Sequence, residues 1–128
     1  MVDEEPTFSI PRRPTRRYRS GGGVEYEGET VFTLRPERDP PDRSPTALVE
    51  SVLDRGPYRY GDWFDLPMPV YLVHDDETGD TFRVAVRDGT VQLHVLPNTD
   101  RAGLRAFYAR LAGRTESAWS VTCRTTRG

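Results

Sequence analysis

Hydrophobic and polar residues alternate along two short segments, residues 81–87 and 90–96, and this pattern predicts the two strands of a hairpin. The dipeptide Asp88-Gly89 between them is typical of a type I′ turn, in which both central residues need a positive φ. Such a turn sets the register, pairing Arg87 with Thr90, Ala85 with Gln92 and Arg83 with His94. The apolar side chains then share one face of the hairpin: Phe82, Val84, Val86, Val91, Leu93 and Val95.

Three further segments show the alternation of half-buried strands. Between residues 24 and 34 the apolar side chains share one parity with glutamates on the other, and Gly28 predicts a bulge or a tight turn. A second segment covers residues 69–74. The third, residues 118–124, carries Cys123 on its apolar parity, so we expect a buried and unreactive thiol there.

Apolar residues at helical spacing predict two helices. The first follows Ser44-Pro45, because serine caps free amide groups and proline suits the first helical position, and it ends at Gly56. Its apolar stripe consists of Leu48, Val49, Val52 and Leu53. The second helix covers residues 98–112, with a stripe formed by Leu104, Phe107, Tyr108 and Leu111.

The predicted order of elements is β-α-β-β-β-α-β. It indicates a single α+β domain over residues 24–128, with a mostly antiparallel sheet of about five strands and two helices packed on one face. A chain of 128 residues has room for one hydrophobic core of this kind. The final strand is a candidate for a sheet edge, although the alternating pattern leaves the order of the strands open.

Residues 1–23 form an arginine-rich arm that we expect to be disordered, because few of its side chains can be buried. Its arginines are Arg12, Arg13, Arg16, Arg17 and Arg19. The formal net charge of the whole chain is −2, yet the arm is positive. It could bind the phosphates of a nucleic acid, fold back on its own acidic domain, or serve only as a solubilising tail.

The polar face of the central strands is the first candidate site within the domain. Arg83, Arg87 and His94 share this face and could bind a phosphate or a carboxylate, since arginine offers a planar fork of donors. The alternative is an ordinary solvent-exposed sheet face. His74 and His94 lie on non-adjacent strands and do not indicate a metal site, and the acidic turn at residues 75–80 lacks the spacing of an EF-hand loop.

The second candidate is the aromatic loop from Tyr58 to Phe64, within a segment, residues 57–69, that we expect to be irregular. Tyr58, Tyr60 and Trp63 are residue types that anchor protein interfaces or stack on bases. The alternative is that they close the end of the core. Both interpretations hold together if Trp63 is buried while Tyr58 and Tyr60 lie outside.

No catalytic motif, cofactor motif or metal site is evident, so we do not expect an enzyme. The leading hypothesis is a small non-enzymatic binding or adaptor domain that acts through a protein partner or by self-association. Nucleic-acid binding by the arm and the arginine and aromatic surface is the alternative, and a small anionic ligand is a weaker one. The chain contains one cysteine and no apolar run that could span a membrane, so we expect a cytoplasmic protein without an intrachain disulfide.

Overall fold

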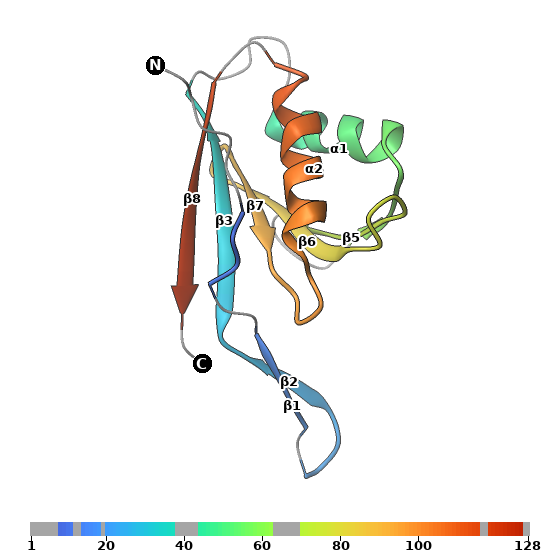
Figure 1. Cartoon of the computed structure of the whole chain (residues 1–128), viewed down its shortest axis with the longest axis vertical. Helices are drawn as coiled ribbons and strands as arrows, with labels where there is room; N and C mark the ends of the chain where they lie inside the picture. Colours follow the sequence, from blue (N-terminus) through green and yellow to red (C-terminus); the bar gives the residue numbers. More distant parts are fainter. Residues whose placement is uncertain are drawn as a thin grey trace.

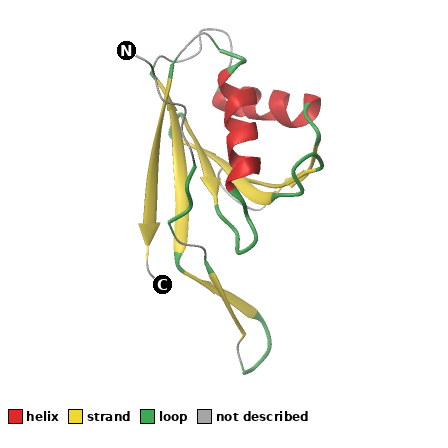
Figure 2. Ribbon diagram, in the orientation of Figure 1, coloured by secondary structure: helices red, strands yellow, loops and turns green. Residues whose placement is uncertain are grey.

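The computed structural model describes residues 8–11, 14–18, 20–37, 44–62, 70–115 and 118–126. In this part of the chain, six antiparallel strands form one sheet, and two helices pack on one of its faces (Figure 1, Figure 2). The predicted α+β class is therefore confirmed. The strands are β1 (Thr15–Tyr18), β2 (Val24–Glu27), β3 (Glu29–Pro36), β4 (Tyr58–Asp62), β5 (Val70–Asp75), β6 (Thr81–Arg87), β7 (Thr90–His94) and β8 (Trp119–Thr126), and the helices are α1 (Pro45–Arg55) and α2 (Arg101–Ala112).

The strand order in the main sheet is β4-β5-β6-β7-β3-β8, so β8 and β4 form its two edges. The hairpin β6–β7 has the predicted register, with Arg87 opposite Thr90 and Arg83 opposite His94. Its turn has the expected backbone, with φ of 51° at Asp88 and 75° at Gly89. The turn dipeptide therefore determined the pairing at the centre of the sheet.

Both helices begin and end near the predicted residues. The Ser44 hydroxyl accepts a hydrogen bond from the Ala47 amide at 3.2 Å, and the amide of Gly56 donates to Val52 at the other end of α1. Helix α2 begins at Arg101, three residues later than predicted, because Asp100 is its N-cap and accepts from the Arg101 amide at 2.7 Å.

The core lies between the helices and one face of the sheet. The central strands place alternate apolar residues there, as predicted for the hairpin, and the helices add the predicted stripes. The side chains with the lowest exposure and largest volume are Phe82, Phe107, Leu34, Leu48, Leu53, Leu93, Leu104 and Leu111. The opposite face of the sheet carries no described helix, and we call it the helix-free face.

One predicted strand and one segment predicted to be irregular differ from the structure. The segment 24–34 divides at Gly28, whose φ of 85° breaks it into β2 and β3, as its glycine suggested. The segment expected to be irregular after α1 contributes a sixth strand, β4, which pairs with β5. Its glycine and proline content concealed the alternation, and pairing with a neighbouring strand overrode the weak local preference.

The described part of the N-terminal arm contains one short strand and one core side chain. Strand β1 pairs with β2 to form a separate two-stranded sheet, with Arg17 opposite Glu25 in the register. Phe8 is 2% exposed, and its ring centroid lies 5.1 Å from that of Phe32. A single aromatic side chain thus packs on the core, which a composition dominated by arginine and proline did not indicate. Arg12, Arg13 and Arg19 lie outside the described residues.

Candidate functional site

Tyr58 is a core residue, so the expectation that it lies on the surface is wrong. The register of β4 against β5 turns it toward the helices, where it is 9% exposed and packs edge-on against Phe107 at 6.0 Å between ring centroids. Its hydroxyl accepts a hydrogen bond from Arg110 at 2.7 Å. Burial raises the pKa of Tyr58, and the Arg110 hydrogen bond partly opposes this. Tyr58 therefore stabilises the fold instead of offering a surface.

Tyr60 keeps some of the predicted exposure. It is 38% exposed, its hydroxyl donates to the Asp54 carboxylate on α1, and its ring packs edge-on against Tyr71 at 5.8 Å. Trp63 lies outside the described residues. The predicted aromatic surface is thus reduced, in the described part of the chain, to one tyrosine that is already engaged with α1.

The predicted anion site is only partly assembled on the helix-free face. Arg83 and His94 stand directly opposite each other. His94 lies 3.5 Å from the Glu29 carboxylate and 3.3 Å from the Gln92 side-chain oxygen, and burial lowers its pKa although Glu29 opposes the shift. Arg87 is four residues further along β6 than Arg83, which is about 13 Å. Arg87 is thus set apart from the Arg83–His94 pair along the strand, and a single anion held by all three side chains stays a prediction.

The acidic turn after β5 serves the fold. One Asp75 oxygen accepts from the amides of Glu77 and Thr78 at 2.8 and 3.3 Å. Asp80 is 7% exposed, and its carboxylate accepts from the Gly103 amide in the first turn of α2 at 2.6 Å. Desolvation raises the pKa of Asp80, opposed by that hydrogen bond. Among the described residues, no group of three or more His, Cys, Asp or Glu side chains is placed to hold a metal ion.

The outer edge of β8 is the most extended backbone surface among the described strands. It is eight residues long, follows β3 from end to end and lies at the side of the sheet (Figure 1). The Glu37 amide donates to the Ala118 carbonyl at 2.9 Å, so Glu37 and Ala118 form a hydrogen-bonded pair next to the end of the ladder. In an antiparallel ladder every second pair of opposite residues is hydrogen-bonded. Even-numbered residues of β8 therefore bond to β3. The odd-numbered residues direct their N–H and C=O groups outward: Trp119, Val121, Cys123 and Thr125.

Cys123 is exposed, which overturns the expectation of a buried thiol. Its parity was right, because it stands opposite the core residue Phe32. The helices, however, cover the inner strands, whereas β8 is the outermost one (Figure 2). Parity predicts the face on which a side chain lies but not how far the covering layer extends.

The other edge strand, β4, offers less free backbone. It has five residues, contains Gly61, and lies beside α1 through the Tyr60–Asp54 hydrogen bond. Arg59 on this strand forms an ion pair of 2.7 Å with Asp76. Short length, a glycine and a charged side chain are features that reduce pairing at a sheet edge.

Comparison with family models, curated proteins and solved structures finds no match to this chain. Within the described residues, neither helix is long and apolar enough to cross a membrane.

Proposed function

We propose that this domain is a non-enzymatic protein-interaction module that assembles by strand addition at β8, with a second copy of the chain as the added strand. The observation that carries the proposal is the outward-directed backbone of β8, which no described strand pairs with on that side. A cytoplasmic location is part of the same proposal.

The composition of β8 supports strand addition. Its sequence, WSVTCRTT, is rich in β-branched residues and contains neither proline nor glycine. Edge strands that avoid pairing with another chain usually contain proline, several charged residues or a bulge. The only charged side chain in this strand is Arg124, which lies on the helix-free face and not on the backbone edge.

A second copy fits this edge because the pattern is self-complementary. An antiparallel β8–β8 pair centred on Thr122 sets Val121 opposite Cys123 of the second copy and Trp119 opposite Thr125. All of these are outward-directed residues, so about eight backbone hydrogen bonds form across the junction. Arg124 then faces Ser120 of the second copy, and no like charges meet. Both helices lie over other strands (Figure 1), so the second sheet approaches without meeting them.

The expected affinity is modest. Eight hydrogen bonds contribute a net of about 4–12 kcal/mol, while association costs about 4–15 kcal/mol in lost freedom. Burial of the flanking side chains adds to the favourable side. We therefore expect a dissociation constant in the micromolar range.

The test is sedimentation equilibrium of the whole chain from low to high micromolar concentration, with two matched variants. Cys123→Pro removes one outward N–H without touching the bonds to β3, and Cys123→Ser keeps that N–H. We expect the wild type and Cys123→Ser to dimerise alike and Cys123→Pro to stay monomeric. A wild type that is monomeric throughout, or a proline variant that dimerises as strongly, would contradict the proposal.

Nucleic-acid binding remains a second proposal, supported by the charges on the helix-free face. The described strands place five arginines and the carboxylate of Glu29 on this face, and Asp76 and Asp88 in the adjoining turns form ion pairs with two of these arginines. The arginines are Arg35, Arg59, Arg83, Arg87 and Arg124. The side chains of Arg59 and Arg87, which form these ion pairs, are 76% and 59% exposed. In the arm, Arg16 and Arg17 lie in β1.

This alternative is tested by fluorescence anisotropy of a labelled single-stranded oligonucleotide at low and moderate salt. It predicts that the double variant Arg59→Gln, Arg87→Gln weakens binding and lowers the salt slope by about 1.4, since each phosphate contact to a single strand contributes about 0.7. The matched control is Arg101→Gln, which removes an exposed arginine from α2 on the other face. Equal losses in both variants would contradict a site on the helix-free face.

A further inference from the structure

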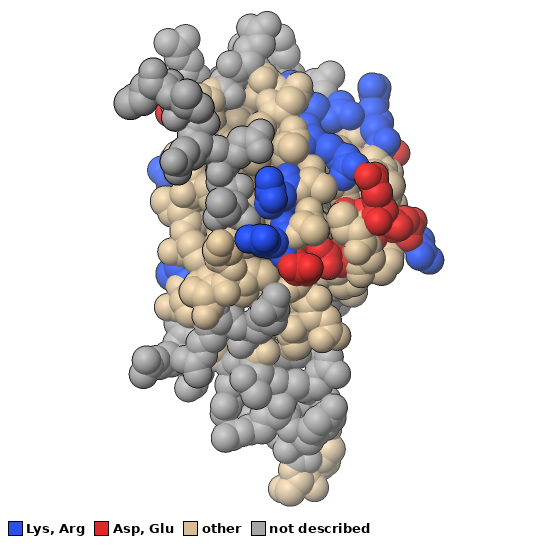
Figure 3. Space-filling model, viewed as in Figure 1, with Lys and Arg blue, Asp and Glu red and all other residues tan. Residues whose placement is uncertain are grey.

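An open hollow of about 470 Å³ lies where the C-terminal turns of α1 and α2 meet. Its lining contains three arginines and no acidic residue: Val52, Arg55, Gly56, Ala109, Arg110, Gly113 and Arg114. Figure 3 shows arginine side chains gathered over this helical side of the molecule. The volume falls in the range of about 300–1,000 Å³ that is typical of small-molecule sites.

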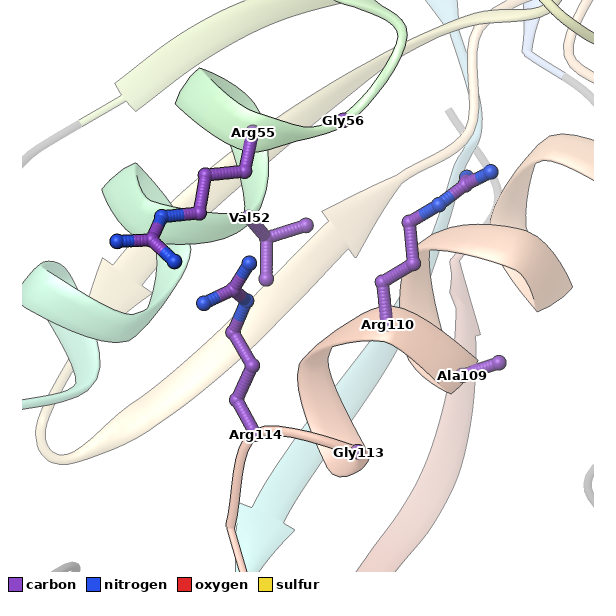
Figure 4. A pocket seen from close by; sticks show the side chains of 7 residues that line it. All are labelled: Val52, Arg55, Gly56, Ala109, Arg110, Gly113 and Arg114. Carbon is purple, nitrogen blue, oxygen red and sulfur yellow. The ribbon is translucent and has the colours of Figure 1, made fainter.

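The three arginines differ in how they are held. Arg110 donates to the Tyr58 hydroxyl at 2.7 Å and to Glu77 at 3.0 Å, so a carboxylate already balances its charge. Arg114 reaches across to α1 and donates to the Ser51 hydroxyl at 2.7 Å. Figure 4 shows the guanidinium groups of Arg55 and Arg114 turned toward one another, while that of Arg110 points away from them. Within the described residues, neither Arg55 nor Arg114 forms an ion pair with an acid.

The helix dipoles do not balance these two charges. Each helix C-terminus carries the equivalent of about −0.5 elementary charge, so the two ends together supply about −1. Arg55 and Arg114 supply +2. An excess of about one positive charge therefore remains between two guanidinium groups that face each other, and an anion placed between them removes the repulsion.

We propose that this hollow binds a small phosphorylated molecule, with Arg55 and Arg114 holding the phosphoryl group. Two guanidinium forks present paired N–H donors to the several terminal oxygens of one phosphoryl group. Ser51 is a positioning residue, because its hydroxyl directs Arg114. Val52, Ala109 and the two glycines provide a small apolar floor for the rest of the molecule. This site is separate from β8, so it stands or fails independently of the proposed assembly.

The test is a titration of the ¹⁵N-labelled whole chain, followed by the backbone amides of Gly56 and Gly113 and the side-chain Nε–H of the arginines. The probes are adenosine monophosphate, inorganic phosphate and succinate, all at constant ionic strength. We expect saturable shifts confined to the hollow, with adenosine monophosphate binding at least as tightly as phosphate and both more tightly than succinate. Shifts that never saturate, or succinate binding as tightly as the phosphates, would overturn the proposal.

Variants locate the site. Arg55→Gln should weaken adenosine monophosphate binding about tenfold or more, because it removes one charged fork. Arg105→Gln is the matched control: it removes an exposed arginine from α2 that does not line the hollow. Because Arg55 is exposed, its variant should fold, and the amide spectrum checks this directly. Equal affinity in wild type and Arg55→Gln, or equal losses in both variants, would overturn the assignment.

Discussion

Gly103 sits in the first turn of α2, directly against the carboxylate of Asp80. A Cβ atom added at Gly103 would lie 2.6 Å from both Cβ and Oδ2 of Asp80. In an unobstructed helix, the change from glycine to alanine stabilises by about 1 kcal/mol. Here the collision costs about 1–3 kcal/mol, and the displaced hydrogen bond from the Gly103 amide to the carboxylate costs about 1.5–3 kcal/mol more. Gly103→Ala should therefore destabilise the domain by a net of about 1.5–5 kcal/mol.

The assay is urea denaturation at neutral pH followed by tryptophan fluorescence, in three backgrounds. Asp80→Ala keeps the Cβ of residue 80 that the new Cβ at residue 103 would meet, so Gly103→Ala should still lower the free energy of unfolding in this background. Asp80→Gly removes the Cβ as well, so Gly103→Ala should cost much less or even stabilise. If Gly103→Ala stabilises the wild type, or costs the same in the Asp80→Gly background, the explanation by close contact is refuted.

Three further predictions follow from the described side chains. Tyr58→Phe should lower the free energy of unfolding by about 0.5–2 kcal/mol, because it removes the acceptor for Arg110, and a shifted urea midpoint checks this. Burial lowers the pKa of His94 in the fold against the opposing effect of Glu29, so the unfolded chain protonates first as the pH falls below 6.5. Stability should then decrease from that pH toward the folded pKa, and the wild type should lose more between pH 7.5 and 5.5 than His94→Gln. Cys123 should react with Ellman's reagent in the native fold, at a rate that denaturant barely raises; a thiol that reacts only after unfolding would contradict its exposure.

Local signals in the sequence predicted the centre of the fold. Asp88-Gly89 set the β6–β7 register because that turn accepts few other conformations, and Ser44 and Gly56 marked the ends of α1 because free backbone groups must be capped there. These features depend on a few neighbouring residues. They can therefore be predicted without any knowledge of the tertiary structure.

Features that depend on distant parts of the chain were missed. Strand β4 became a strand only by pairing with β5, and Phe8 became buried only because Phe32 and Tyr108 provide a place for its ring. The contact between Asp80 and Gly103 joins residues 23 positions apart, and no periodicity relates them.

The candidate sites divide in the same way. The sequence placed Arg83 opposite His94 and Arg87 four residues away, and it suggested β8 as an edge without identifying its neighbour. Arginines near helix C-termini are common because they complement the dipole, so Arg55 and Arg114 carried no distinct signal. Only the crossing of the two helices brings them together.

The most direct test of strand addition at β8 is hydrogen exchange of its individual amides at low and high protein concentration. The amides of Thr122 and Arg124 bond to β3 and should be protected at both concentrations. Those of Val121, Cys123 and Thr125 point outward, and strand addition predicts that they exchange rapidly in dilute solution and become protected as the concentration rises. Outward amides that exchange equally fast at every concentration would contradict it.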